Sequence, residues 1–314
     1  MKIFYAGTPW IAVPALESLS KHFTVCGVLT NPDRKSGRGR KITVSPVKGK
    51  ALELGLDVYQ PEIIDSSFCK NIEALEPDIL VTFAYGKIFK TSFLNIFSRE
   101  CINIHPSLLP KYRGPSPLSA VILAGDSETG ITVQKMAPRM DTGDIIVQHR
   151  FPLDGTETLE SLTGYTALKS AEIIISALIA ITNNTHVSIP QEEEKATYCG
   201  LIKKEDGLVD WNLPAALIER MYRAYYPWPG IFTYFEEKLI IITDCSVVQN
   251  KTVSGFTGYK PGAVVSADRN SGLIVKTGNG MLRINKLKMQ ASKEIDYKSF
   301  INSSEICKGS VFGR

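Results

Sequence analysis

The chain has 314 residues, a length that suits two domains of ordinary size. Hydrophobic residues make up 44% of it and charged residues 22%, which excludes an intrinsically disordered chain and is typical of a soluble globular protein. The net charge of +4 is too small to indicate a nucleic-acid partner, but it is uneven: residues 209–314 hold 14 Lys and Arg against 9 Asp and Glu, and residues 1–208 hold 22 against 23. The basic C-terminal part is either a polyanion-binding surface or simply a basic soluble domain.

The cysteines and the apolar segments predict the compartment. None of the six cysteines stands in a CxxC spacing and no His completes a zinc pattern, so we expect reduced thiols and no metal site. The opening "KIFYAG" lacks the charged region of a signal peptide. The most apolar stretch, Ile173–Ile181, is shorter than the roughly 20 residues of a membrane span. These features predict a cytoplasmic protein without a membrane partner.

The first part of the chain alternates β-rich and helical runs. We expect strands over 2–7, 23–30, 78–84 and 101–106, and helices over 13–22, 45–55 and 116–125. "GITVQKM" and "DIIVQHRF" read as two adjacent strands, and a helix over 156–181 closes the domain. This alternation predicts an α/β, Rossmann-like domain over 1–182 with a mostly parallel sheet.

The composition and periodicity of the sequence change after residue 182. Residues 183–208 are polar and lack sustained periodicity, so we expect an interdomain linker there. A helix begins near residue 212, and short strand-like segments separated by Gly, Asn and Asp follow it. Residues 209–314 are therefore expected to form a small β-barrel domain.

Asn103 and His105 stand two residues apart near the carboxyl end of the strand expected over 101–106. Alternate strand residues share one face, and open α/β sheets bind ligands at the carboxyl ends of their strands. An Asn amide can donate to a developing oxyanion, and a His can exchange a proton near neutral pH. Alone, however, the pair is more typical of a polar strand end with a structural His.

A third group stands in the loop between the two later strands. Asp141 lies in "APRMDTGDI", where Gly143 gives the backbone freedom to turn. A carboxylate there could orient His105 and stabilise its protonated form. A D-x-G-D turn alone is common and indicates little.

The segments "HPSLLPKYRGPSP", "GITV" and "MDTGDI" together resemble the folate-dependent formyltransferase family, whose signature is an N-x-H strand followed by a loop Asp. The resemblance implies that Asn103, His105 and Asp141 are catalytic, that 10-formyltetrahydrofolate is the co-substrate and that no metal is needed. "APRM" (137–140) replaces an acidic stretch usual in the family, and Lys135 stands where a neutral residue is common. The resemblance further implies a folate pocket lined by Phe83, Ala84, Tyr85, Gly86, Ser107, Leu108, Leu109, Pro110 and Asp141, with main-chain groups reading the pterin edge.

Residues 4–19, 31–48 and 210–233 extend the resemblance to the members of this family that act on charged initiator tRNA. It implies a monomer with an OB-like C-terminal barrel that holds the acceptor stem, and Arg38 at the position that probes the weak first base pair. A basic, glycine-containing loop suits that task because mobile cations attract phosphates. The residues expected to bind tRNA are Arg34, Lys35, Arg38, Arg40 and Lys41.

The expected reaction moves a formyl group from 10-formyltetrahydrofolate to the α-amino group of methionine on initiator Met-tRNA, for translation initiation. That amine has a pKa of about 7.7–8.0, so a neutral fraction exists without a strong base. Asn103 and protonated His105 are expected to stabilise the oxyanion. His105 would then protonate the leaving nitrogen, directly or through a water placed by Asp141.

Three alternatives stay open at this point. A formyltransferase for a purine-pathway amine or a nucleotide sugar would share the catalytic residues, but the glycine-rich phosphate loop expected of the purine enzyme is absent from "AGTPWIAVP". An RNA-binding protein with a degenerate catalytic domain would not need Asn103, His105 and Asp141. A hydrolase releasing formate would not need the basic loop.

Overall fold

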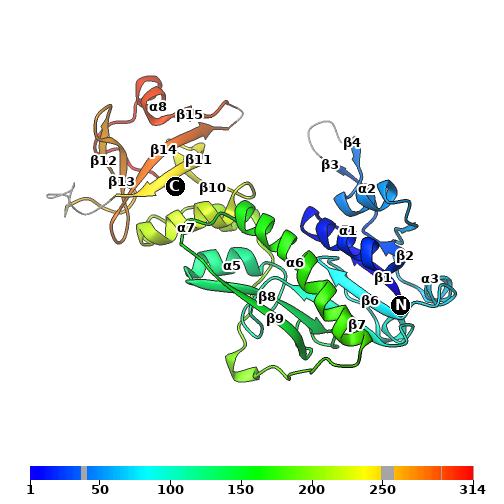
Figure 1. Ribbon diagram of the computed structural model, residues 1–314. Coiled ribbons are helices and arrows are strands. Elements are labelled where there is room, and N and C mark those ends of the chain that lie inside the picture. Colours follow the sequence, from blue (N-terminus) through cyan, green and yellow to red (C-terminus); the bar gives the residue numbers. More distant parts are fainter. Residues whose placement is uncertain (37–40, 249–257, 291, 314) are drawn as a thin grey trace. The chain divides into compact units, whose positions relative to one another are not determined.

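The computed structural model describes residues 1–36, 41–248, 258–290 and 292–313, and the chain divides into two compact units (Figure 1). The N-terminal unit comprises Met1–Leu118, Ser127–Asp154 and Ser161–Gly200. The C-terminal unit comprises Ser119–Asp126, Gly155–Glu160 and Leu201–Arg314. Residues 183–200, which the sequence assigned to a linker, are thus part of the N-terminal unit. The expected domain limits at 182 and 209 stay a prediction.

The N-terminal unit is built on a seven-stranded sheet in the order β5-β2-β1-β6-β7-β8-β9. All pairs from β5 to β7 are parallel, and β8 and β9 add antiparallel pairs, which confirms the Rossmann-like, mostly parallel fold class. From β1 the chain builds outward to β2 and β5, then returns to β6 on the other side of β1. The strands are β1 (Lys2–Gly7), β2 (Thr24–Leu29), β5 (Val58–Tyr59), β6 (Ile79–Phe83), β7 (Glu100–His105), β8 (Glu128–Lys135) and β9 (Ile145–Pro152).

That return makes the carboxyl ends of β1 and β6 a topological switch point, where doubly wound sheets bind their ligands. The central strands are buried on both faces, as parallel strands between helices are. On one face, Phe4 and Ala6 of β1 pack with Leu80 of β6, Ile72 and Phe93 in an aromatic-rich cluster. This core fixes the backbone of the strand ends that carry the polar residues.

Helices and short strands fill the connections. Ser45 caps α2 by accepting a hydrogen bond from the Lys48 main-chain N–H, with Pro46 at the first helical position, and Asp65 caps α3 in the same way through Phe68. Gly125, at φ +72°, follows α5. The elements are η1 (Trp10–Ala12), α1 (Val13–His22), β3 (Arg34–Ser36), β4 (Lys41–Thr43), α2 (Pro46–Glu53), α3 (Ser66–Glu73), α4 (Thr91–Leu94), α5 (Pro117–Ala124), α6 (Leu159–Thr182) and η2 (Glu193–Lys195).

Helix α6 has the length and composition of a membrane-spanning segment, being 24 residues long with few charges. Its buried residues recur at helical spacing, as Leu162, Thr166, Ser170, Ile173 and Ile174 illustrate, and continue to Ile181. One buried stripe on an apolar helix is the pattern of a core helix, so the feature is weak evidence for a membrane span.

The C-terminal unit holds an antiparallel sheet in the order β10-β11-β14-β13-β12, with β15 paired to β14. The small β-barrel domain expected over 209–314 is therefore present as an antiparallel-sheet domain. Trp211 is buried in this unit, where its indole N–H donates to Thr233 and its ring stacks on Phe312. The elements are η3 (Lys204–Gly207), α7 (Ala215–Tyr225), β10 (Ile231–Phe235), β11 (Lys238–Val247), β12 (Val264–Asp268), β13 (Gly272–Lys276), β14 (Met281–Met289), β15 (Ile295–Asp296) and α8 (Tyr297–Ser303).

Candidate active site

A row of polar residues crosses three adjacent strands of the N-terminal sheet. The register pairs Thr82 of β6 with Asn103 of β7, and Asn103 with Gln134 of β8. Thr82 Oγ1 donates a 2.7 Å hydrogen bond to Asn103 Oδ1. Because the amide oxygen is engaged in this way, the Asn103 NH₂ group is the end that can donate to a reacting oxygen.

His105, at the carboxyl end of β7, is only 4% exposed. Its Nε2 lies 2.9 Å from the main-chain oxygen of Tyr112, which can only accept, so Nε2 carries a proton and donates it. Burial lowers the pKa of His105, although the carboxylate of Asp141 and the Tyr112 carbonyl both act to raise it. The resting imidazole is therefore neutral near pH 7, and Nδ1 is the nitrogen that can accept a proton. The protonated His105 expected from the sequence must then arise during the reaction.

The Asp141 carboxylate lies next to both His105 and Asn103. Its Oδ1 lies 3.6 Å from His105 Nδ1 and 3.5 Å from Asn103 Nδ2, and it accepts a 2.9 Å hydrogen bond from Gln134 Nε2. Its Oδ2 accepts a 2.8 Å hydrogen bond from the main-chain N–H of Gly114. Asp141 itself has a left-handed backbone, with φ +56°, a conformation that Asp tolerates better than most residues. The structure thus brings together the three residues expected to be catalytic.

The loop that carries Asp141 is held by contacts at its two ends rather than by the "APRM" residues 137–140. Lys135, at the end of β8, forms a 2.9 Å ion pair with Glu100, and the Arg139 side chain is 74% exposed and lies 3.9 Å from Glu193. A Cβ atom on Gly143 would stand 1.8 Å from the Lys135 carbonyl oxygen. Glycine at 143 therefore lets the two ends of the loop approach each other, while the side chain at 139 points to solvent.

Most of the residues expected to bind folate lie in the loops after β6 and β7, while Phe83 ends β6 and Asp141 follows β8. Ala84 and Gly86 have positive φ, at +51° and +84°. Several main-chain groups of these loops already have partners within the protein. The carbonyls of Tyr85, Ser107 and Leu109 accept from Asn31, Thr132 and Gln148, and the Leu109 N–H donates to Thr132. Recognition of the pterin edge therefore has to use the remaining groups of the loops, and it stays a prediction for all nine residues.

Of the residues expected to bind tRNA, Arg34, Lys35 and Lys41 lie on the paired strands β3 and β4. Arg34 is exposed and pairs with Thr43, and Ser36 pairs with Lys41. For Lys35 and Lys41 the structure describes the backbone alone, and Arg38 and Arg40 lie outside the described residues. The base of the two strands is fixed by Asp33, which forms a 2.5 Å ion pair with Lys48 and accepts from Gln60, and both contacts lower the pKa of Asp33.

Sequence reasoning missed the groups that hold the side chains expected to be catalytic: Thr82, Gln134 and the Gly114 N–H. A signal was present, since Thr82 is the one polar residue of the buried strand β6 and Gln134 is a buried amide on β8. A buried polar side chain needs a partner, and register alone identifies it.

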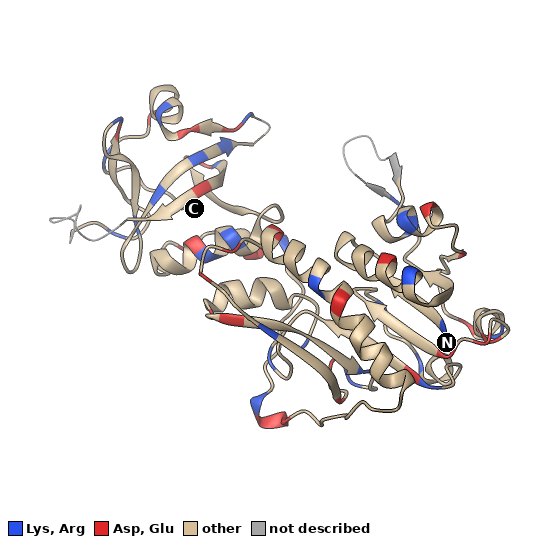
Figure 2. Cartoon of the chain, in the orientation of Figure 1, with Lys and Arg blue, Asp and Glu red and all other residues tan. Residues whose placement is uncertain are grey.

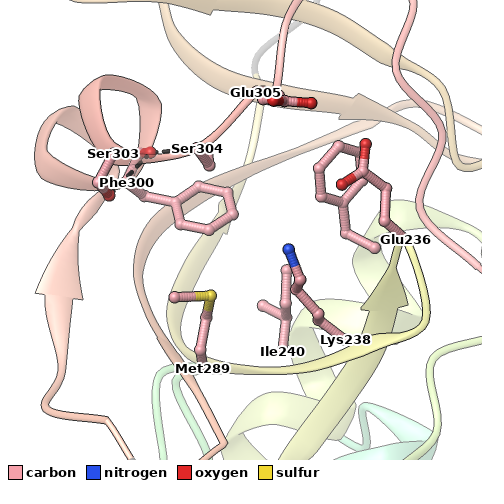
Figure 3. A pocket seen from close by; sticks show the side chains of 9 residues that line it. Glu236, Lys238, Ile240, Met289, Phe300, Ser303, Ser304 and Glu305 are labelled. Atoms are coloured by element: carbon pink, nitrogen blue, oxygen red, sulfur yellow. Dashed lines mark hydrogen bonds between the residues drawn. The ribbon is translucent and has the colours of Figure 1, made fainter.

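The C-terminal unit contains basic side chains and a cavity, and none of these residues belongs to the predicted catalytic or folate-binding sets. Strand β14 carries Arg283, Lys286 and Lys288, and Lys and Arg residues of the C-terminal unit are blue in Figure 2. Lys238 points into a cavity of about 280 Å³ (Figure 3). The nine lining residues are Phe235, Glu236, Lys238, Ile240, Met289, Phe300, Ser303, Ser304 and Glu305. Across the described ranges, no cluster of three His, Cys, Asp or Glu side chains could hold a metal ion.

Comparison with known proteins identifies both parts of the chain. Residues 3–178 match the formyl transferase family, and residues 201–305 match the formyl transferase C-terminal domain. The methionyl-tRNA formyltransferase of Treponema denticola is 41% identical over 312 residues, covering 97% of each chain. That of Borrelia turicatae is 38% identical, covering 99% of this chain and all of the relative.

Solved structures share the fold at lower identity. The N-formyltransferase of Helicobacter canadensis, in complex with folinic acid and dTDP-3-aminofucose, superposes with a TM-score of 0.66 at 20% identity over 94% of this chain and 100% of its own. The sugar 3N-formyl transferase WlaRD gives 0.65 at 20% identity over 93% and 99%. The matches over both parts, and identity near 40% along the full length, make this chain a member of the formyl transferase family, within its methionyl-tRNA formyltransferases.

Proposed function

We propose that this enzyme transfers the formyl group of 10-formyltetrahydrofolate to the α-amino group of methionine on initiator Met-tRNA. The observation that carries the proposal is the position of Asp141 Oδ1, 3.6 Å from His105 Nδ1 and 3.5 Å from Asn103 Nδ2. A hydrogen-bond donor, a neutral base and a carboxylate are thereby held together at the carboxyl ends of parallel strands. Formyl transfer to an amine needs these three groups.

Asn103 acts on the developing oxyanion. The neutral α-amino nitrogen attacks the formyl carbon, and the carbonyl electron pair moves to oxygen. The Asn103 NH₂ group can donate to that oxygen because Thr82 fixes the amide with its NH₂ end free of the Thr82 contact. The amide is already oriented before substrate binds, so little reorganisation accompanies the reaction.

His105 carries the proton. Its neutral Nδ1 takes a proton from the attacking nitrogen, and the Asp141 carboxylate 3.6 Å away stabilises the imidazolium that forms. The same proton then passes to the folate nitrogen as its bond to the formyl carbon breaks. One proton leaves the amine and one reaches the leaving nitrogen, so His105 ends the cycle neutral.

Two surfaces are proposed to hold the tRNA. One is the basic segment that carries Arg34, Lys35, Arg38, Arg40 and Lys41, where Arg38 is proposed to probe the first base pair of the acceptor stem. On the C-terminal unit, Arg283, Lys286 and Lys288 of β14 offer cations for phosphates. Such contacts fix orientation without reading base sequence, so initiator selectivity falls to the basic segment. Because translation is the process it serves, we propose that the enzyme is cytoplasmic.

The test mixes the purified full-length chain with 10-formyltetrahydrofolate and methionine-charged initiator tRNA and measures formylmethionine after hydrolysis of the ester. A parallel reaction uses methionine-charged elongator tRNA. We expect rapid formylation of the initiator tRNA and slow formylation of the elongator. Absence of formylmethionine would refute the activity, whereas equal rates on both tRNAs would refute only the role of Arg38.

A further inference from the structure

Residues 189–199 hold both loops of the catalytic site. At one end, Ile189 exchanges two main-chain hydrogen bonds with Ile145 of β9, at 2.8 and 2.9 Å. At the other end, the main chain of 197–199 pairs with that of 110–113, with Arg113 N–H donating to the Thr197 carbonyl at 2.8 Å. The segment therefore spans from the strand after the Asp141 loop to the loop after His105.

Between these anchors, the Gln191 side chain reaches the backbone of the Asp141 loop. Its Nε2 donates to the Gly143 carbonyl at 2.7 Å and to the Asp141 carbonyl at 2.9 Å, and it lies 3.2 Å from Gln134 Oε1. Gln134 in turn donates to the Asp141 carboxylate. Gln191 thus touches the main chain of Asp141, the main chain two residues on, and the side chain that binds its carboxylate.

A buried arginine fixes the orientation of the Gln191 amide. Arg113 is 1% exposed, and its Nε donates to Gln191 Oε1 at 3.1 Å. Because Arg113 can only donate, the Gln191 oxygen must face it and the NH₂ group must face the carbonyls. The far side of Arg113 is held by Glu193 at 2.9 Å and by the Tyr198 hydroxyl at 3.0 Å. All four residues belong to the N-terminal unit.

We propose that Gln191, oriented by Arg113, is a positioning residue that fixes Asp141 against His105 and Asn103; the inference rests on the proposed formyl-transfer function. Asp141 has a left-handed backbone, which persists in a folded protein when surrounding contacts overdetermine it. Gln191 supplies two of those contacts to the loop main chain without itself touching the reacting groups. A displacement of a catalytic group by about 1 Å is enough to slow a reaction roughly 100-fold.

Two variants separate the contacts of Gln191. Gln191→Met keeps the length of the side chain and removes every hydrogen bond. Gln191→Glu keeps an acceptor for Arg113 but turns a second oxygen, in place of the donor, toward the Asp141 and Gly143 carbonyls. Glu194→Gln serves as the matched control, because Glu194 is exposed three residues further along the same segment. Thermal unfolding establishes that each protein is folded before it is assayed.

The measurements are kcat and KM for both substrates, together with an NMR titration of the His105 imidazole. For Gln191→Met and Gln191→Glu we expect kcat to fall roughly 10- to 100-fold, with KM changed less than about threefold. The control Glu194→Gln should match the wild type. The pKa of His105 should fall in Gln191→Met, because the Asp141 carboxylate that raises it has moved away. Gln191→Glu brings a carboxylate of its own, so it is compared by kcat alone. A Gln191→Glu enzyme as fast as wild type, or a fall in kcat of Gln191→Met with an unchanged His105 pKa, would overturn the proposal.

Failure of the proposed function gives a different result. If the wild-type chain produces no formylmethionine, the function is refuted, and the titration alone still decides whether Gln191 positions Asp141. If the wild type is active and Gln191→Met equals it, the positioning role alone is refuted.

Discussion

Thr82 Oγ1 donates a 2.7 Å hydrogen bond to Asn103 Oδ1, and Asn103 Nδ2 lies 3.5 Å from Asp141 Oδ1, which can only accept, so the NH₂ end of the Asn103 amide faces Asp141. The two residues are register partners on adjacent parallel strands, so the sheet itself sets their separation. Thr82 is buried, and its hydroxyl also lies 3.3 Å from the Ile102 carbonyl. The neighbouring strand β6 thus holds the Asn103 amide in place through Thr82.

Replacement of Thr82 by Val keeps the shape of the side chain and removes the hydroxyl. We expect kcat to fall about tenfold because the Asn103 amide loses its fixed orientation, and stability to fall by about 1–2 kcal/mol. The Thr129 hydroxyl of β8 is buried without a hydrogen-bond partner among the described residues, so Thr129→Val should be neutral or stabilising. Equal effects of the two substitutions on kcat would exclude an orienting role for Thr82.

The charge of Asp141 is expected to matter more than its shape. Asp141→Asn should lower kcat about 100-fold or more, because an amide cannot stabilise the imidazolium at His105 Nδ1 and would place a donor against Gln134 or Gly114. Asp144→Asn, three residues further along the same loop, is the matched control and should keep wild-type kcat. Steady-state formylation kinetics give both values, and a fast Asp141→Asn enzyme would remove the carboxylate from the mechanism.

Burial of His105 predicts a pH dependence of stability. Its folded pKa lies below its ordinary value of 6.5, so the unfolded chain takes up a proton that the folded chain does not. The contribution to stability is therefore fully present above pH 6.5 and is lost as the pH falls toward the folded pKa, by up to about 1.4 kcal/mol per pH unit.

Urea unfolding between pH 7.5 and 5.5 should show this decline in the wild type and a weaker decline in His105→Gln. His22→Gln removes an exposed imidazole at the end of α1 and should follow the wild type. Parallel curves for all three proteins would contradict the burial of a neutral His105.

A substitution at Gly143 tests whether the two ends of the Asp141 loop must lie in close contact. Gly143→Ala would place a Cβ atom 1.8 Å from the Lys135 carbonyl oxygen, so the backbone must move. We expect a loss of about 1–3 kcal/mol in stability and a fall in kcat, because Asp141 moves with the loop. Gly49→Ala meets no atom within 4 Å in α2 and should stabilise by up to about 1 kcal/mol. Urea denaturation of the two variants measures the change in the free energy of unfolding of each.

Sequence patterns predicted the elements that have long or strongly periodic runs. The helix over 13–22, the strand predicted over 78–84 and observed over 79–83, and the pair of strands around Asp141 were predicted from the alternation of β-rich and helical runs. The short elements were not predicted: α4 has four residues and β5 two, which is too little for a periodic signal. Their positions depend on contacts with β1 and β2, which lie far from them in the sequence.

The side chains proposed to be catalytic were predicted from the resemblance, but the residues that hold them in place were not. Gln191 stands in a polar stretch that resembles a linker, and only the folded structure shows it on the Asp141 loop. The neutral state of His105 likewise depends on burial by residues far along the sequence. The "APRM" segment changed the charge of the loop while leaving the contacts of Asp141 in place, because those contacts come from β8, Gly114 and Gln191.

The central claim is that Asn103, His105 and Asp141 form the formyl-transfer site. The most direct test measures single-turnover formylation of initiator Met-tRNA by the wild type and by Asn103→Ala, with the affinity of each for the tRNA measured in parallel. The account predicts formylmethionine from the wild type and almost none from Asn103→Ala, with tRNA affinity unchanged. Near-normal formylation by Asn103→Ala would contradict it.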